Sequence, residues 1–274
     1  DNKNFKWNST LTFAANHEEI TDLIDGKDII GAESSITSSL LIGRPLRSYH
    51  YFINQGIWQE NEAEEAAKYF KDAKKTQSFK PGDIKLQDLD GNFIIDDNDR
   101  TYLGSQSPKW TGGLNNNFSY KNFDLNAFFV YAGGNKLRNS VVSMSDQIGS
   151  QTLKGISNRW SADEPDAQVR MYHDMPSQVK TYAGIFEDWW KYGDINVKDA
   201  GYVKLRSLSL GYSLPSGICR QIRLNSLNLK LQVNNLFTWC KAGSDIDPES
   251  YGLNSGTRGM ASPKTYSIGL STSF

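Results

Sequence analysis

The chain has 274 residues, of which 22% are charged, and its formal net charge of −1 does not favour a nucleic-acid partner. Its mean hydropathy is −0.55, and no apolar run reaches about eighteen residues, which excludes a transmembrane helix. A membrane barrel is not excluded, because barrel strands are short and apolar only at alternate positions. The sequence opens without an initiator Met or a signal-like segment, so we expect either a removed signal or an excerpt from a longer chain.

Six stretches alternate between apolar and polar residues, a pattern typical of β-strands whose two faces meet different surroundings. In LNLKLQVN, for example, Leu229 and Leu231 fall on one face and Lys230 and Gln232 on the other. The predicted strands lie near residues 4–14, 108–120, 123–133, 201–214, 226–238 and 263–274. The polar faces carry Asn, Thr, Ser, Gln and Lys, and aromatic residues gather at strand ends, as in the wet lumen and interfacial girdles of a membrane barrel. A soluble antiparallel sheet with one solvated face fits the alternation equally well.

The connections between these strands favour the barrel. Only Lys121 and Asn122 separate the second and third strands, which predicts a two-residue hairpin. Three connections are long, at residues 15–107, 134–200 and 239–262. Short turns at one rim and long loops at the other are typical of outer-membrane barrels, so we expect the long connections to be extracellular.

Two segments of the first long connection predict structure of their own. NEAEEAAKYFKDAKK (residues 61–75) predicts a short charged helix, and SYHYFINQGIWQ predicts an extra strand or extended segment. Cys219 and Cys240 flank a complete strand, which separates them by some tens of ångströms, so we predict two free thiols.

Several motifs resemble the late barrel region of SusC/RagA-type TonB-dependent outer-membrane transporters. They are GDIKLQDLDGNFIIDDNDRTYLGSQSPKWTGGLNNNFSYKNFDLNAFF, NRWSADEPDAQVR, DAGYVKLRSLSLGYSLP, NNLFTW and the terminal PKTYSIGLSTSF. These motifs follow the order found in the family and cover nearly the whole chain, from Phe5 to Phe274. The resemblance implies an all-β fold, in which the chain forms about the last six strands of an antiparallel transmembrane β-barrel of roughly 22 strands.

The resemblance also implies that part of the protein is missing from this chain. About six strands are too few to close a membrane barrel, and an open edge would leave backbone groups unsatisfied in lipid. We therefore expect the plug domain and the TonB-contacting segment to be absent here, and the chain expressed alone to be insoluble or misfolded. The last strand resembles the family's barrel-assembly signal, an alternating strand with a terminal aromatic residue. Its members here are Tyr266, Ile268, Leu270 and Phe274.

The stretch DLDGNFIIDDND has the spacing of a twelve-residue calcium-binding loop. The candidate ligands are Asp88, Asp90, Asn92, the carbonyl of Ile94, Asp96 and Asp99. Phe93 replaces the glycine that is usual at the sixth position, where a sharp turn often needs a positive φ. The segment therefore predicts either a structural Ca²⁺ site that fixes an outer loop or a hydrated acidic turn.

Aromatic residues are frequent in the long connections, and sugar rings or peptides pack well on such side chains. The candidates for substrate binding are Trp58, Trp160, Trp189 and Tyr192. The alternative is that these residues fasten loops to one another or to a lid protein.

Catalysis has little support in the sequence. His17, His50 and His173 are scattered and lack metal-ligand spacing, and no nucleophile-elbow, P-loop or dinucleotide-binding motif is present. We therefore expect a protein that is not an enzyme and has no organic cofactor.

The resemblance implies TonB-dependent import of oligosaccharides or oligopeptides across the outer membrane of a Gram-negative, Bacteroidetes-type cell. The implied partners are a SusD-like surface lipoprotein acting as a lid, TonB through the absent segment, outer-membrane lipid and the barrel-assembly machinery. A soluble calcium-dependent carbohydrate-binding β-protein is an alternative of a different class, which would use the same aromatics and Asp loop. A smaller self-contained barrel would need further strands within residues 30–60 and 180–200.

Overall fold

The computed structural model describes residues 4–31, 39–138, 159–166, 194, 197–243, 246–250 and 262–274, and its largest element is a six-stranded sheet. All neighbouring strands of this sheet pair antiparallel, in the order β1-β6-β7-β10-β11-β12. The strands are β1 (Phe5–Ala15), β6 (Trp110–Tyr120), β7 (Phe123–Gly133), β10 (Tyr202–Ser213), β11 (Ser226–Cys240) and β12 (Thr265–Ser273). The predicted antiparallel all-β fold is confirmed.

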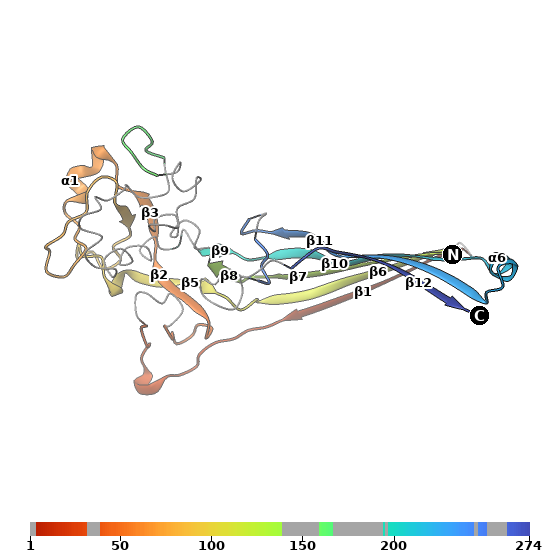
Figure 1. Cartoon of the computed structure of the whole chain (residues 1–274). Helices are drawn as coiled ribbons and strands as arrows, with labels where there is room; N and C mark the ends of the chain where they lie inside the picture. The colour runs from red at the N-terminus through yellow and green to blue at the C-terminus, as the bar shows by residue number, and fades with distance from the viewer. Residues whose placement is uncertain are drawn as a thin grey trace.

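The central sheet is long and narrow, and its two ends differ (Figure 1). At one end the chain reverses between β6 and β7 through Lys121 and Asn122, and between β10 and β11 through a segment that contains α6 (Ser216–Gln221). Lys121 has a φ of 52°, in the left-handed region that tight hairpin turns favour. Both chain termini lie at this end, which we call the turn end, and the described parts of the long connections lie at the opposite loop end (Figure 1).

The connection between β1 and β6 folds into a lobe, residues 39–106, at the loop end of the sheet (Figure 1). Its elements are β2 (Ser48–Phe52), β3 (Asn54–Ile57), η2 (Glu60–Glu62), α1 (Ala63–Ala66), β4 (Ile84–Leu86), η3 (Asp97–Asp99) and β5 (Arg100–Ser105), and the 3-10 turn η1 (Ile24–Gly26) precedes them. β2 pairs with β5 and β3 with β4, so the expected extra strand is present as β2 and β3. Large aromatic side chains dominate the core of the lobe, with Tyr51 and Phe52 almost fully buried.

The helix expected over residues 61–75 is much shorter than predicted and consists of α1 alone, after the 3-10 turn η2. A competing set of backbone hydrogen bonds explains the difference. The N–H of Phe70 donates to the carbonyl of Phe93 at 2.8 Å, and the carbonyl of Phe70 accepts the N–H of Ile95 at 3.0 Å. A continuing helix would need the same groups for its internal bonds, so this segment instead attaches to the aspartate-rich loop.

One more two-stranded sheet lies at the loop end, formed by β8 (Lys136–Arg138) and β9 (Val197–Asp199). The described strands within residues 30–60 and 180–200 belong to the small sheets and do not join the central one. The described part of the chain therefore does not form the smaller barrel that extra strands would have allowed.

Within the described part of the chain, the middle of the central sheet carries no second layer. Among the described residues of its six strands, the buried apolar side chains are Ala132 and Cys240, both at the loop end. Cys219 and Cys240 are free thiols, as predicted. None of the described helices has the length and apolar character needed to cross a membrane.

Candidate functional site

Most of the apolar side chains of the six strands lie on one face of the central sheet. Cross-strand pairing aligns them in rows, because residues that pair directly point to the same face. One row consists of Trp7, Phe118, Leu125, Leu210, Leu231 and Ile268. The rings of Trp7 and Phe118 stack with centroids 5.8 Å apart. Trp7 is 63% exposed and Ile268 is 79% exposed, so none of the described residues covers the two ends of the row, and the row marks a surface that needs an apolar environment.

Aromatic rings flank this apolar face at both ends. At the turn end, the rings of Phe123 and Tyr212 lie 4.6 Å apart. At the loop end, the side chain of Tyr131 crosses Gly112, and its hydroxyl donates to the carbonyl of Thr12 at 2.8 Å. A Cβ at Gly112 would overlap the Tyr131 ring, so this close approach requires glycine. Paired aromatic belts are typical of the two interfaces of a membrane barrel.

The opposite face of the central sheet is mainly polar, although Phe128 and Val130 of β7 also lie on it. One of its cross-strand rows consists of Asn8, Asn117, Asn126, Ser209, Gln232 and Ser267. The side-chain amide of Asn126 donates to Oδ1 of Asn115 at 2.8 Å and to Oδ1 of Asn117 at 2.6 Å. Uncharged amides and hydroxyls bond readily to water and to polar solutes, as the wall of an aqueous lumen requires.

A β-bulge keeps the two faces separate along β10. Relative to β7, one extra residue, Arg206, lies between Leu205 and Ser207. The bulge shifts the alternation by one position, so that Leu205 falls on the same apolar face as Leu208. A sequence pattern read with a strict period of two does not show this shift.

Beside the bulge, an ion network joins the polar face of the sheet to the connection after β11. The side chain of Lys204 is only 1% exposed, and its Nζ lies 2.7 Å from Oε2 of Glu249 and 3.4 Å from Oδ2 of Asp247. Arg206 pairs with the second carboxylate oxygen of Glu249. Burial raises the pKa of Glu249, but its hydrogen bonds with Lys204 and Arg206 outweigh this effect and hold the pKa below its ordinary value. The network therefore fixes residues 246–250 against the polar face.

The predicted calcium loop brings three carboxylates together. Asp88, Asp90 and Asp99 each offer one oxygen, and these oxygens all lie within 4.8 Å of one another. Ca²⁺–oxygen distances of about 2.3–2.6 Å allow opposite ligands to lie up to about 5 Å apart, so the three residues fit one cation. Phe93 adopts a φ of 64°, and the left-handed turn forms without glycine. Its ring contacts that of Tyr69 at a centroid distance of 5.2 Å, which helps to offset the steric cost of this conformation.

The side chains of the predicted ligands Asn92 and Asp96 lie outside this group of three carboxylates and accept hydrogen bonds from backbone N–H groups of the same loop. Oδ1 of Asn92 accepts the N–H of Ile94 at 2.6 Å. Oδ1 of Asp96 accepts the N–H of Asn98 at 2.8 Å, so this carboxylate caps the 3-10 turn η3. The neighbouring Ile95 is buried and forms part of the core of the lobe.

Electrostatics differs between the two ends of the aspartate loop. Burial raises the pKa of Asp99, and the nearby charges of Asp88 and Asp90 raise it further. Burial also raises the pKa of Asp88, but backbone N–H donors from Phe93 and Gly91 lower it by more, so the net shift is downward. The loop thus holds a buried carboxylate against two others, an arrangement that a hard cation would relieve.

The candidate substrate-binding aromatics lie inside the lobe or outside the described residues. Trp58 is 3% exposed, with its ring centroid 5.4 Å from that of Tyr69. Trp160 is buried, and its Nε1 donates to Oε1 of Gln59 at 2.9 Å. Burial of these two residues favours the alternative that they fasten loop segments together, because a buried ring offers no face to a substrate. Trp189 and Tyr192 lie outside the described residues.

The residues expected to signal barrel assembly lie on β12 and at the chain end. Tyr266, Ile268 and Leu270 pair with Val233, Leu231 and Leu229 of β11, and so share the apolar face. All of them, and Phe274, are exposed.

Comparison with known proteins gives relatives of one kind, although no family model matches the chain. Three similar proteins of Formosa agariphila are TonB-dependent receptors P3, P26 and P39. Their identities to the chain are 27%, 25% and 25%, over 91%, 99% and 95% of its length. The chain spans about a quarter of the length of these curated relatives, namely 24%, 27% and 26%. The expected resemblance to TonB-dependent receptors is confirmed.

Solved structures of RagAB share the fold of the chain. The RagAB peptide transporter aligns with 100% of the chain at a TM-score of 0.74 and 22% identity, and the chain covers 28% of it. The RagAB peptide importer aligns at TM-scores of 0.71 in its open-open state and 0.72 in its closed-closed state, both at 23% identity. Each of these matches includes the whole chain, which covers 27% and 28% of the two structures.

Proposed function

We propose that this chain is the carboxy-terminal wall of the β-barrel of a SusC/RagA-type TonB-dependent transporter in the outer membrane. The observation that carries the proposal is the division of the single-layered central sheet into one apolar and one polar face. Lipid would cover the apolar face, and a water-filled lumen would lie against the polar face. The similarity to TonB-dependent receptors over most of the chain supports this assignment.

The lengths of the strands suit a membrane. β6 and β7 have 11 residues each, and a strand of about 9–11 residues tilted by about 45° spans the hydrocarbon layer. The outer edges of β1 and β12 would pair with further strands, because an open edge in lipid leaves N–H and C=O groups unsatisfied. Those strands, the plug and the TonB-contacting segment would belong to the rest of a longer protein, since the chain spans about a quarter of its relatives.

The substrates we propose are oligosaccharides or oligopeptides, and the proposed partner is a SusD-like lipoprotein lid over the lobe. The RagAB structures, which are of a peptide transporter and of a peptide importer in open-open and closed-closed states, support peptides as one of these substrate classes. TonB would supply the driving force through the part of the protein outside this chain. The barrel-assembly machinery would recognise the last strand of the chain through Tyr266, Ile268, Leu270 and Phe274.

The aspartate-rich loop has a structural role in this proposal. Asp88, Asp90 and Asp99 would hold a Ca²⁺ ion, whose charge would offset most of the negative charge of the three clustered carboxylates. The loop bonds to Phe70 through its backbone, so a fixed loop would in turn stabilise that segment of the lobe.

The assignment is tested with the full-length protein in a Gram-negative host. We expect it in the outer-membrane fraction, extractable only with detergent, and with the heat-dependent gel migration of a folded barrel. Uptake of labelled oligomers should stop when the TonB complex is inactivated. A folded, monodisperse protein in detergent-free buffer would contradict the proposal and favour the soluble carbohydrate-binding alternative.

A further inference from the structure

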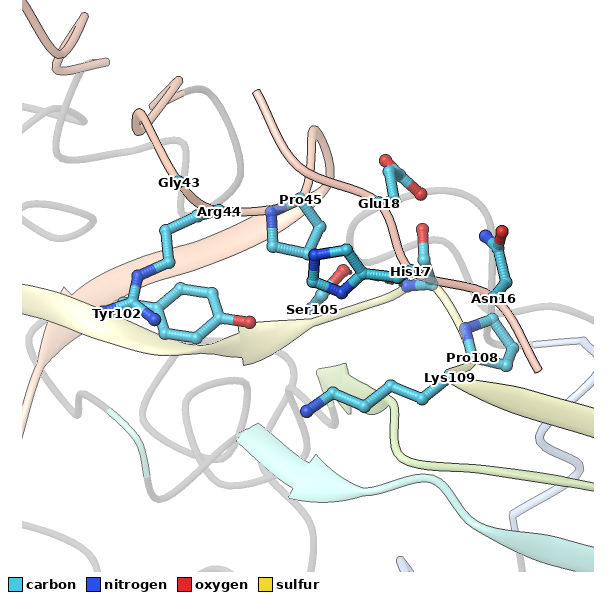
Figure 2. Close-up of a pocket in the computed structure, with 11 residues that line it drawn as sticks. Asn16, His17, Glu18, Gly43, Arg44, Pro45, Tyr102, Ser105, Pro108 and Lys109 are labelled. Carbon is cyan, nitrogen blue, oxygen red and sulfur yellow. Dashed lines mark hydrogen bonds between the residues drawn. The ribbon is translucent and has the colours of Figure 1, made fainter. Parts of the chain in front are cut away.

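A cleft with a mixed polar and apolar lining lies at the loop end of the sheet, where β1 leaves it and β6 enters it (Figure 2). Its volume is about 210 Å³. Three segments line it: residues 16–18 after β1, residues 43–45 of the lobe, and residues of β5 and of the short connection from β5 to β6. The cleft is therefore built jointly by the central sheet and the lobe.

The register of β1 and β6 places this cleft beside the polar face of the sheet. Ala15 pairs with Trp110, and the N–H of Asn16 donates to the carbonyl of Lys109 at 2.9 Å, so the ladder continues by one residue beyond the strands. Trp110 has the parity of the apolar face, and alternation gives Lys109 the parity of the polar face. A ligand in the cleft would thus lie at the mouth of the proposed lumen.

Positive charge dominates the cleft. Its lining includes two cations, Arg44 and Lys109, and one carboxylate, Glu18. His17 also lines it, and its Nε2 lies 3.3 Å from Oε2 of Glu19, which is outside the lining. Oε1 of Glu18 accepts the N–H of Leu46 at 3.1 Å, and in Figure 2 this side chain points away from Lys109. Within the described part of the chain, neither Arg44 nor Lys109 is paired with a carboxylate.

Tyr102 holds the guanidinium of Arg44 in place. The Cζ atom of Arg44 lies 4.6 Å from the centroid of the Tyr102 ring, which is the arrangement of a cation–π contact. Such a contact restrains the side chain but leaves the N–H donors of a guanidinium available for a planar anion. The cleft therefore offers a positioned fork of donors together with the ammonium of Lys109.

We propose that the cleft binds a carboxylate group of the imported substrate, with Arg44 as a bidentate donor and Lys109 as a second cation. This inference rests on the proposed transport function and specifies its substrate as an acidic oligomer. A carboxylate is common to both proposed classes, in a uronic acid of a glycan and in the carboxy terminus or an acidic side chain of a peptide. Bidentate pairing between the planar guanidinium and a carboxylate would both attract the substrate and orient it at the mouth of the proposed lumen.

The test measures binding to the full-length protein in detergent by titration calorimetry. The probes are trigalacturonate and its neutral methyl ester, and N-acetyl-trialanine and its amide. We expect at least one free acid to bind about tenfold or more tightly than its neutral counterpart, the value of one charge-assisted hydrogen bond. Trigalacturonate would identify a glycan source of the carboxylate, and N-acetyl-trialanine a peptide source.

Matched variants locate the effect. Arg44→Gln combined with Lys109→Gln should abolish the preference for the free acid, whereas Lys121→Gln, at the turn end, should preserve it. Equal affinity for acids and neutral derivatives, no binding of any probe at millimolar concentration, or a preference that survives in the double variant would each overturn the inference. Outer-membrane fractionation and heat-dependent gel migration are measured on the same samples. A folded outer-membrane barrel that shows no preference for carboxylates would contradict the carboxylate-binding proposal and leave the proposed transport function intact.

Discussion

Substituting arginine on the apolar face of β11 tests whether that face contacts lipid or water, because the loss of folding free energy differs between the two. Val233 pairs with Leu208 and Tyr266 on this face. The preceding residue, Gln232, pairs with Ser209 and lies on the polar face. Val233→Arg and Gln232→Arg thus place the same side chain at adjacent positions of one strand, on opposite faces of the sheet.

The expected magnitude follows from the depth of Val233. It lies four residues from Leu229, which pairs with the aromatic residue Tyr212 at the turn end. At about 3.4 Å per residue and a tilt of about 40°, Val233 lies about 10 Å from that belt, near the middle of an apolar band about 25 Å tall. Arginine at the midplane of a lipid face costs about 2–4 kcal/mol, whereas a substitution on a water-exposed surface changes stability by about 0.5 kcal/mol or less.

Urea titration of the full-length protein in lipid vesicles, with the folded fraction taken from heat-dependent gel migration, measures the difference. We expect Val233→Arg to lose about 2–4 kcal/mol of folding free energy and Gln232→Arg to lose less than about 1 kcal/mol. Equal losses in the two variants, or a loss below about 0.5 kcal/mol in Val233→Arg, would refute the assignment of the two faces.

Other substitutions test the lobe, the ion network and the chain end. Trp58→Ala should destabilise the lobe by about 3–5 kcal/mol, measured by hydrogen exchange, and unchanged protection would contradict its role in the core. Ca²⁺ at about a hundred times its Kd should stabilise the wild-type lobe by about 2.7 kcal/mol. The Asp99→Asn variant should show no such stabilisation, whereas the control Glu64→Gln, on the exposed helix α1, should retain it. Because the pKa of Glu249 is lowered in the folded state, its stabilisation is present above the ordinary pKa of 4.5 and is lost as the pH falls through the lowered value. Limited proteolysis within residues 239–262 should therefore increase in strong acid, and at neutral pH in Glu249→Gln; equal cleavage across pH would argue against the network. Phe274→Ala should reduce the level of folded protein in the outer membrane, and an unchanged level would exclude an assembly role.

The parts of the fold that depend on local pattern could be predicted from the sequence. Alternation on both sides of Lys121 and Asn122, although incomplete, predicts the β6–β7 hairpin, because the turn length and the period of two fix its register together. The bulge at Arg206 could not be predicted in this way, because apolar residues remain frequent on both sides of it. A strict period assigns Leu205 to the polar face, whereas pairing with Phe129 places it on the apolar one.

The lobe and its contacts depend on long-range packing that a local pattern does not contain. The helix over residues 61–75 stops after α1, because Phe70 bonds to the aspartate loop more than twenty residues away. Trp58 is similar: an aromatic residue in a predicted loop fits a binding surface or a core equally well until its neighbours are known. The alternating pattern does not predict the ion pair between Lys204 and Glu249. A lysine within a predicted barrel strand nevertheless indicates that an acidic side chain lies nearby.

A barrel wall and a soluble sheet differ most directly in the solvent that touches each face of the sheet. Spin labels on β12 report this solvent through their collisions with oxygen and with a water-soluble nickel complex. The labels are placed one at a time at Ser267, Ile268, Leu270 and Ser271. The full-length protein is used in outer-membrane lipid, after its native cysteines are replaced. The account predicts high oxygen access at positions 268 and 270 and high nickel access at positions 267 and 271. Nickel access that is equally high at all four positions would show water on both faces and contradict a membrane barrel.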